Sequence, residues 1–224
     1  FRGGRVDELI RIPDETFSLM QEIGVRYIQI GVESGSQRIL DLMDKQIEVE
    51  DAVELNKRLK YFPKIRPAYN FFSGIPTETV EDIKMSVNLI FRLLDDNPSS
   101  LISAFNHYTP YPGTKLFDLS VKFGLKPPER LEDWVNFDES NFAMRAPWLD
   151  ARTKSILNMA YISSFFIDTK IEDLFDRGKL KYRMMMMLLM LYRPLAKFRL
   201  RHLFARLLFE KYIINLLKII GIPK

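Results

Sequence analysis

The first half of the chain alternates short apolar runs with longer amphipathic stretches. Three runs rich in β-branched and aromatic residues, at 27–32, 67–72 and 101–106, are predicted to be strands. Apolar residues spaced three and four apart predict helices around them. These helices cover 14–23, 37–43, 49–61, 83–94 and 116–123. Strands and helices in this order are typical of parallel βα units. We therefore predict an α/β fold, in which a partial parallel βα barrel is followed by a mainly α-helical C-terminal extension.

The second half of the chain has a different pattern. Residues 126–150 are loop-like and carry scattered aromatic residues, namely Trp134, Phe137, Phe142 and Trp148. We interpret these as anchors that pin the segment to the barrel, with direct substrate contact as the alternative. The stretch 151–177 is predicted to be helical and to end at Gly178. We expect a barrel part at 1–125, a loop and helical extension packed on it at 126–178, and a basic amphipathic helical tail at 179–224.

Composition excludes several kinds of site. With 224 residues, 47% of them hydrophobic, the chain can bury a sizeable core. It contains no cysteine, which excludes disulfides and any thiolate-bound zinc or iron–sulfur site within these residues. The two histidines, His107 and His202, are far apart in sequence and do not indicate a metal site. No signal-peptide pattern follows Phe1, so we expect a cytoplasmic protein and interpret the abrupt start as that of a fragment.

Charge is distributed unevenly along the chain. Residues 179–224 carry eleven Lys and Arg against one Glu, whereas residues 1–178 carry 22 against 28 acidic residues. The apolar run at 184–192 is shorter than the about 20 residues that a membrane-spanning helix needs. Two interpretations remain for the tail: peripheral membrane contact, or a helical cap that packs on the barrel or on a partner domain. Nucleic-acid binding is not favoured, because the basic residues are interleaved with Leu, Met and Ile.

Polar residues follow each predicted strand at its carboxyl end, where parallel barrels place their ligand sites. Glu33 and Ser34 follow the first strand, and a carboxylate there can accept hydrogen bonds from a sugar diol. Alternatively, Glu33 pairs with an arginine of the barrel lumen and Ser34 caps the next helix. Gly35 allows the backbone to approach a ligand closely.

The other two strand ends carry similar alternatives. Ser73, Gly74 and Ile75 offer a bare backbone with room for a flat ring, or they form a plain turn in which Thr77 caps the next helix. Asn106, His107 and Tyr108 offer hydrogen-bonding groups at the third end. His107 is a candidate proton carrier or a structural histidine. No nucleophile with a partnered base and no phosphate-binding loop is visible, so the residues themselves indicate a ligand-binding barrel wall.

Taken in order, three segments resemble the radical S-adenosylmethionine (radical SAM) enzymes: 31–36 (GVESGS), 74–79 (GIPTET) and 108–114 (YTPYPGT). The resemblance covers residues 1 to about 125 and implies the C-terminal half of a radical SAM TIM-like barrel. It implies S-adenosylmethionine as a cofactor and a [4Fe-4S] cluster that generates a 5′-deoxyadenosyl radical. The implied cofactor-binding residues are Glu33 and Ser34 at the ribose, Ser73, Gly74 and Ile75 beside the adenine and methionine, and Tyr108 and Thr109 at the nucleoside.

The most similar subgroup carries a cobalamin-binding domain and includes the anaerobic magnesium-protoporphyrin IX monomethyl ester cyclases. This resemblance implies an enzyme that functionalises C–H bonds of a small-molecule substrate, for example by methyl transfer or cyclisation. The chain departs from the family because the three cluster-binding cysteines are missing. We therefore expect a C-terminal fragment that is inactive alone. The alternatives are a non-catalytic, cluster-less barrel that serves as a binding or membrane-associated module, and an unrelated hydrolase or aldolase.

Overall fold

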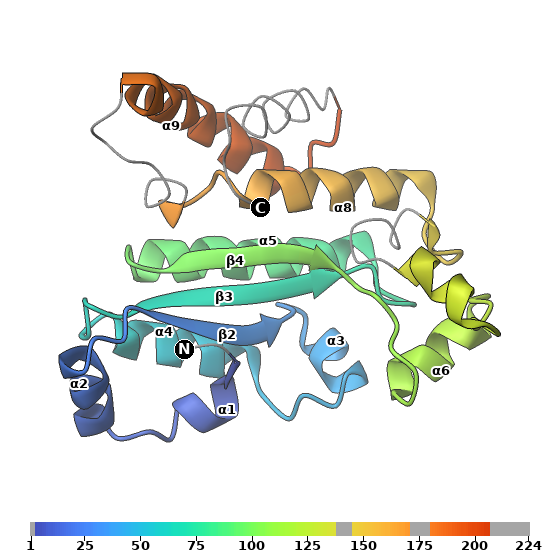
Figure 1. Cartoon of the computed structure of the whole chain (residues 1–224), viewed down its shortest axis with the longest axis horizontal. Helices are drawn as coiled ribbons and strands as arrows, with labels where there is room; N and C mark the ends of the chain where they lie inside the picture. The colour runs from blue at the N-terminus through green and yellow to red at the C-terminus, as the bar shows by residue number, and fades with distance from the viewer. Residues whose placement is uncertain (1–2, 138–144, 171–179, 207–224) are drawn as a thin grey trace.

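The computed structural model describes residues 3–137, 145–170 and 180–206, and its centre is a four-stranded parallel sheet (Figure 1). The strands lie side by side in chain order. They are β1 (Gly4–Arg5), β2 (Tyr27–Glu33), β3 (Arg66–Ser73) and β4 (Leu101–His107). All three pairings are parallel, as the sequence pattern predicts. The α/β class and the βα succession are thus confirmed, whereas the four strands form an open sheet and not a closed barrel.

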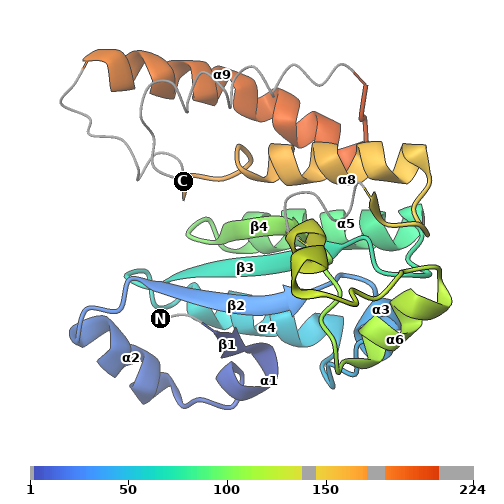
Figure 2. The same cartoon turned by 45° about the vertical axis from the view of Figure 1, so that its right-hand side comes forward.

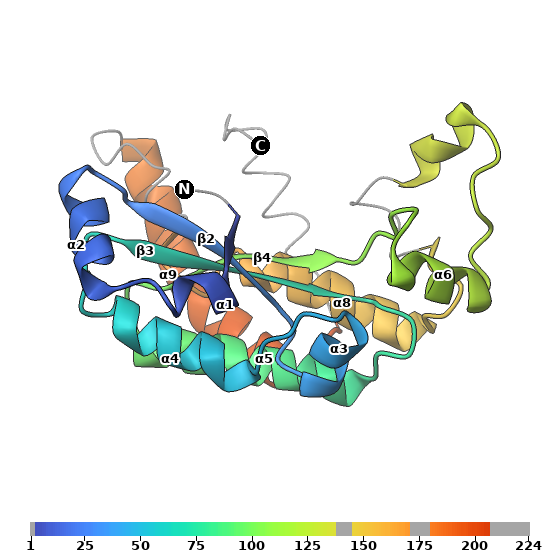
Figure 3. The same cartoon turned by 90° about the horizontal axis from the view of Figure 1, so that it is seen from below.

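Helices join the strands and follow the sheet. They are α1 (Val6–Leu9), α2 (Asp14–Glu22), α3 (Gln37–Leu42), α4 (Val49–Leu59), α5 (Val80–Asp96), α6 (Lys115–Lys122), α8 (Ala151–Ser164), α9 (Leu180–Arg201) and the 3-10 helix η1 (Leu131–Phe137). Helices α4 and α5 run along one face of the sheet (Figure 3). Alternate residues of the strands, such as Ile28, Ile30, Tyr69 and Phe71, are fully buried in the core on this side.

The opposite face of the sheet is polar and half-buried. Gln29 of β2 donates to Asn70 Oδ1 of β3 over 3.2 Å and to Ser103 Oγ of β4 over 3.1 Å. One hydrogen-bonded row of polar side chains thus crosses three strands. A strand with one apolar and one polar face alternates with a period of two residues. The sheet therefore presents a wall with a packed outer side and a hydrogen-bonding inner side, the arrangement that a partial barrel requires.

The segment after α8 covers the free edge of β4. The backbone N–H of Ile102 donates to Asp168 Oδ2 over 2.7 Å, and Lys170 Nζ donates to the Ile102 carbonyl over 2.7 Å. Ser164 Oγ accepts from the backbone N–H of Phe105 over 3.3 Å. These side chains satisfy backbone groups that a further strand would otherwise pair.

This edge contact also explains an error in the predicted helix 151–177. The helix ends at Ser164, because the chain must turn there to bring Asp168 and Lys170 to the strand edge. The remainder of the prediction, at 171–177, lies outside the described residues, as do Phe142 and the end of the tail at 207–224. Trp148 does anchor its segment, since its indole N–H donates to the Gly74 carbonyl over 2.8 Å.

Helix α9 lies across α8 on the side of the molecule away from β1 and β2 (Figure 2). Its residues Leu189, Tyr192, Ala196 and Leu200 are buried in the common core. Arg201 stacks on the Phe91 ring of α5, with 4.3 Å between the guanidinium carbon and the ring centroid. Within the described part of the chain, no helix is long and apolar enough to cross a membrane.

The edge cap provides a stability test. Asp168 is buried beside Lys170, with 3.1 Å between Oδ2 and Nζ. Asp168→Ala leaves a buried ammonium without its counter-charge, and we expect it to lower the free energy of unfolding by about 3 to 5 kcal/mol. The matched control is Glu50→Ala, which breaks the exposed ion pair with Arg92 and should cost less than about 1 kcal/mol. Urea denaturation measures both variants; equal costs would show that the edge contact does not hold the sheet.

Candidate functional site

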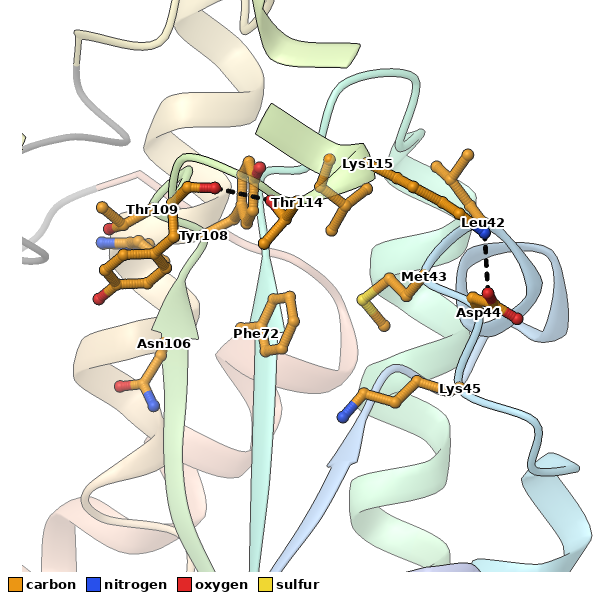
Figure 4. A pocket seen from close by; sticks show the side chains of 13 residues that line it. Leu42, Met43, Asp44, Lys45, Phe72, Asn106, Tyr108, Thr109, Thr114 and Lys115 are labelled. Carbon is orange, nitrogen blue, oxygen red and sulfur yellow. Dashed lines mark hydrogen bonds and ion pairs between the residues drawn. The ribbon is translucent and has the colours of Figure 1, made fainter. Parts of the chain in front are cut away.

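A cavity of about 610 Å³ opens at the carboxyl ends of β3 and β4 (Figure 4). Four segments line it: the end of α3 with the following loop at 42–45, Phe72 of β3, Asn106 and His107 of β4, and the stretch after β4 up to Leu116. This volume falls within the range of small-molecule sites. The position is the one at which parallel α/β proteins bind ligands.

Two buried polar atoms at this cavity have no hydrogen-bond partner. They are Nε2 of His107 and Oγ1 of Thr109. Burial lowers the pKa of His107, although a hydrogen bond with the backbone of Leu157 opposes that shift. The imidazole is therefore neutral near pH 7. Both atoms are closed off from solvent, and the His107 ring packs on Tyr161 of α8 with 5.3 Å between ring centroids. The imidazole therefore lies against the helix and does not face the open cavity.

Tyr108 forms an aromatic wall of the cavity. Its ring stacks on Phe72 with 6.3 Å between centroids and contacts Trp148 at 6.5 Å. Its hydroxyl lies 3.3 Å from Ser120 Oγ, and burial raises its pKa. Ile75 and Ile39 are buried in the same small apolar cluster. Of the residues implied by resemblance, Tyr108 and Thr109 line the cavity directly, while Ile75 supports its wall.

Glu33 lies at the rim of this region in a strained backbone conformation. Its φ is +71°, in the left-handed region that L residues rarely adopt. Its carboxylate accepts from Lys45 Nζ over 2.8 Å and folds over Gly31, where a Cβ atom would come within 2.5 Å of Oε1. The partner is therefore a lysine from the loop after α3 and not an arginine of the lumen. Because Lys45 itself lines the cavity, the ion pair connects Glu33 to it.

Ser34 points away from the cavity. It is fully buried, with its Oγ 3.2 Å from Ser86 Oγ of α5, and it accepts from the Ser36 N–H over 3.1 Å. Ser36 is the N-cap residue of α3 by position, but its hydroxyl donates to Asp82 and not to the helix. Gly35 lies against α5, where an added Cβ would approach the Met85 carbonyl oxygen to 2.6 Å. The glycine is thus required for the turn to pack on α5.

Ser73 and Gly74 also face away from the cavity. The Ser73 hydroxyl donates to Glu78 Oε2 over 2.6 Å, and the Gly74 N–H donates to the same oxygen. Gly74 has φ +95°, and the space where its Cβ would lie is occupied by Leu157 at 3.2 Å. No room for a flat ring exists on that side. The next helix is capped by Thr79 and not by Thr77, because Thr79 Oγ1 accepts from the Asp82 N–H over 3.2 Å.

Glu78 lies within the 74–79 segment and is a titratable group that the sequence pattern did not single out. Burial raises the pKa of its carboxyl to about 7, against the lowering effect of hydrogen bonds from Ser73, Gly74 and Ile75. Its second oxygen, Oε1, is buried without a partner. Lys45 and Lys115 were missed as lining residues, since a lysine in a loop or a first helical turn usually indicates a solvated surface.

The residues of this chain do not fit an iron–sulfur cluster. The sequence has no cysteine. Within the described ranges, no group of three or more His, Asp or Glu side chains is placed to hold a metal ion. Any cluster that serves this site must be held by residues outside the chain.

Comparison with known proteins finds similarity to enzymes. It is 28% identical over 160 residues to an uncharacterized methyltransferase of Pyrococcus horikoshii, covering 70% of this chain and 33% of that protein. It is 32% identical over 127 residues to the tRNA-2-methylthio-N(6)-dimethylallyladenosine synthase of Pelagibacter ubique, covering 56% of the chain and 26% of the synthase. The synthase of the same name from Buchnera aphidicola is 34% identical over 109 residues, covering 47% of this chain and 23% of that synthase.

The chain thus spans a third or less of the length of these relatives. No protein-family model matches it. The comparisons support enzymes of methyl or methylthio transfer as relatives, and they do not reach the cobalamin subgroup or the protoporphyrin cyclases.

The raised pKa of Glu78 predicts a specific pH dependence of stability. The folded state binds a proton more tightly than the unfolded state, whose carboxyl has the ordinary pKa of 4.5. The stabilisation is therefore complete below pH 4.5 and is lost as pH rises through about 7. Relative to wild type, we expect Glu78→Gln to gain of the order of 3 kcal/mol between pH 4 and pH 8.

Urea unfolding at a series of pH values measures this difference in the free energy of unfolding. The lowered pKa of His107 makes stability rise with pH, but both proteins contain this histidine, so its contribution cancels in the comparison. The control is Glu81→Gln, at an exposed glutamate in the first turn of α5, the helix that follows Glu78. Its curve should run parallel to that of wild type. If the stability of Glu78→Gln also followed that of wild type at every pH, the raised pKa of Glu78 would be contradicted.

Proposed function

We propose that this chain is part of a radical SAM enzyme and that the cavity at its strand ends holds the nucleoside of S-adenosylmethionine. Three features support the proposal. The segments at 31–36, 74–79 and 108–114 resemble those of the family. The relatives are named as a methyltransferase and as methylthio-group synthases. The cavity lies at the ends of β3 and β4, and residues of the third segment line it.

The observation that carries the proposal is the aromatic wall of a cavity at the carboxyl ends of two parallel strands. A nucleoside presents a flat ring with hydrogen-bonding edges, so it can stack on an aromatic surface and donate to buried acceptors at the same time. Tyr108 and Phe72 supply the aromatic surface. The exposed Asn106 and the ammonium of Lys45 supply hydrogen-bonding groups on the cavity lining. Thr109 also lines the cavity, and in our proposal its hydroxyl, which has no partner in the protein, turns toward the ligand.

Glu33 is the candidate ribose contact. Its carboxylate is held by Lys45, whose side chain lies at the cavity rim. A ribose diol would donate to this carboxylate while Lys45 stays near it as a counter-charge. Ser34, Ser73, Gly74 and Ile75 would then act from behind the site, by fixing the turns that carry Glu33 and Tyr108.

The reaction requires groups that this chain does not supply. When bound, a [4Fe-4S] cluster provides the electron that cleaves S-adenosylmethionine to the 5′-deoxyadenosyl radical. In our proposal its cysteines lie in another part of the full-length enzyme, and the chain alone is inactive. A cobalamin domain, also outside the chain, is proposed on the subgroup resemblance alone.

We further propose methyl transfer, cyclisation or another C–H functionalisation of a small-molecule substrate. A tRNA acceptor is a second candidate, favoured by the names of the synthases. A cluster-less binding barrel is the remaining alternative. Reconstitution of the full-length enzyme with iron and sulfide separates the radical SAM proposals from the cluster-less barrel, because only a radical SAM enzyme releases 5′-deoxyadenosine from S-adenosylmethionine under reducing conditions.

Thr109→Val tests the cavity directly. Valine has the shape of threonine but lacks Oγ1, which has no partner within the protein. We expect the variant to be as stable as wild type or slightly more stable, because a buried unsatisfied hydroxyl is removed. We expect its affinity for S-adenosylmethionine to fall about five- to tenfold, the effect of one lost hydrogen bond.

Equilibrium dialysis with radiolabelled S-adenosylmethionine measures the affinity. Thr16→Val, on the exposed surface of α2, serves as the control and should bind as wild type does. Equal binding by Thr109→Val and wild type would contradict the assigned role of Thr109.

A further inference from the structure

Helix α9 turns an apolar stripe toward solvent. Met187, Leu191, Leu195 and Phe198 are exposed by 60%, 70%, 40% and 52%. They are spaced by four, four and three residues, which places them on one side of the helix. The residues of the opposite side, Leu189, Tyr192, Ala196 and Leu200, are buried against the protein. The helix is therefore apolar on both faces, and only one of them is used by the fold.

Exposed apolar residues are concentrated here. Including Met190 and Phe204, six of the sixteen large hydrophobic side chains that are exposed in the described part of the chain fall within residues 187–204. Single exposed hydrophobic residues are common on protein surfaces, but a contiguous group of them marks an interaction site. Neither the strand-end cavity nor the sheet makes use of this stripe.

The segment that carries the stripe is basic, and one of its charges is paired with the body of the protein: Arg201 Nη2 lies 3.7 Å from Asp95 Oδ2. Residues 180–206 contain seven Lys and Arg and no Asp or Glu. Lys197 lies on the flank of the stripe and is half-buried, while Arg201 and Arg206 lie at its C-terminal end and are exposed. Arg199 has a different role, because it is buried and donates to the carbonyls of Phe204 and Arg206. The stripe thus combines apolar contact area with a positive border.

We propose that this stripe, together with its basic border, docks on the surface of an anionic lipid bilayer. An apolar face edged by Lys and Arg, on a helix that cannot cross a bilayer, matches an interfacial helix. Residues 1–178 carry a net negative charge, so an anionic bilayer repels this part of the protein. The repulsion orients the protein with α9 toward the lipid. Nucleic acid fits less well, because Met and Leu occupy the positions at which polar groups would contact phosphates.

Vesicle co-flotation of the full chain tests the proposal. We expect the protein to float with vesicles of equal parts phosphatidylcholine and phosphatidylglycerol, and to bind pure phosphatidylcholine at least tenfold more weakly. Leu191→Gln with Phe198→Gln should abolish flotation, because the apolar contact is lost. Lys197→Gln with Arg206→Gln should weaken binding to the anionic vesicles about fivefold for each charge removed. Arg201 is left unchanged, because it contacts Phe91 and Asp95 of α5. Tyr61→Gln, at an exposed aromatic residue after α4, should have no effect.

Thermal unfolding of the same variants shows whether the stripe is free. Unchanged stability of the Leu191→Gln and Phe198→Gln double variant supports the proposal. A marked loss of stability would show that another part of the chain covers the stripe, and would overturn it. Flotation that is equal for wild type and the double variant, or binding to tRNA in place of vesicles, would also overturn it.

Discussion

The geometry of the strand ends depends on one buried carboxylate, Asp82 in the first turn of α5. It accepts hydrogen bonds from Ser36 after β2, from Arg38 of α3 and from Thr79 before α5. Burial opposes its ionisation, but the hydrogen bonds from Arg38, Ser36 and Thr79 outweigh burial and hold its pKa well below the usual range. One ionised group thus ties the turn after β2 to the turn after β3. Arg38 adds a second link between the two turns, since it also donates to the Thr77 carbonyl over 2.9 Å.

The hydrogen bonds of Asp82 affect the turn after β2 and the turn after β3. Ser34, Gly35 and Ser86 fill the space behind this junction, which leaves Glu33 on the opposite side with a strained φ of +71° and a single ion-pair partner. Glu78 similarly closes the turn after β3 from behind. Most polar residues of these two turns therefore build the wall of the site. In our proposal Glu33 faces the cavity, together with Tyr108 and Thr109, which follow β4.

The sequence predicted the strands and most of the helices, because their apolar spacing is strong and their turns are short. It also singled out Tyr108 and Thr109, which line the cavity. It could not separate Ser34 from Glu33, since neighbouring residues at a strand end point to opposite sides. It missed Lys45, which approaches from a loop twelve residues after Glu33. It extended the helix beyond Ser164, because the need to cover the β4 edge is not a local property of the sequence.

The central claim is that a nucleoside binds at the carboxyl ends of β3 and β4. Hydrogen–deuterium exchange of the chain with and without S-adenosylmethionine tests it most directly. We expect protection of the backbone at 42–45 and 106–111, the segments that line the cavity, with no change in α2 at the opposite end of the sheet (Figure 1). Protection confined to other segments, or none at saturating ligand, would contradict the claim.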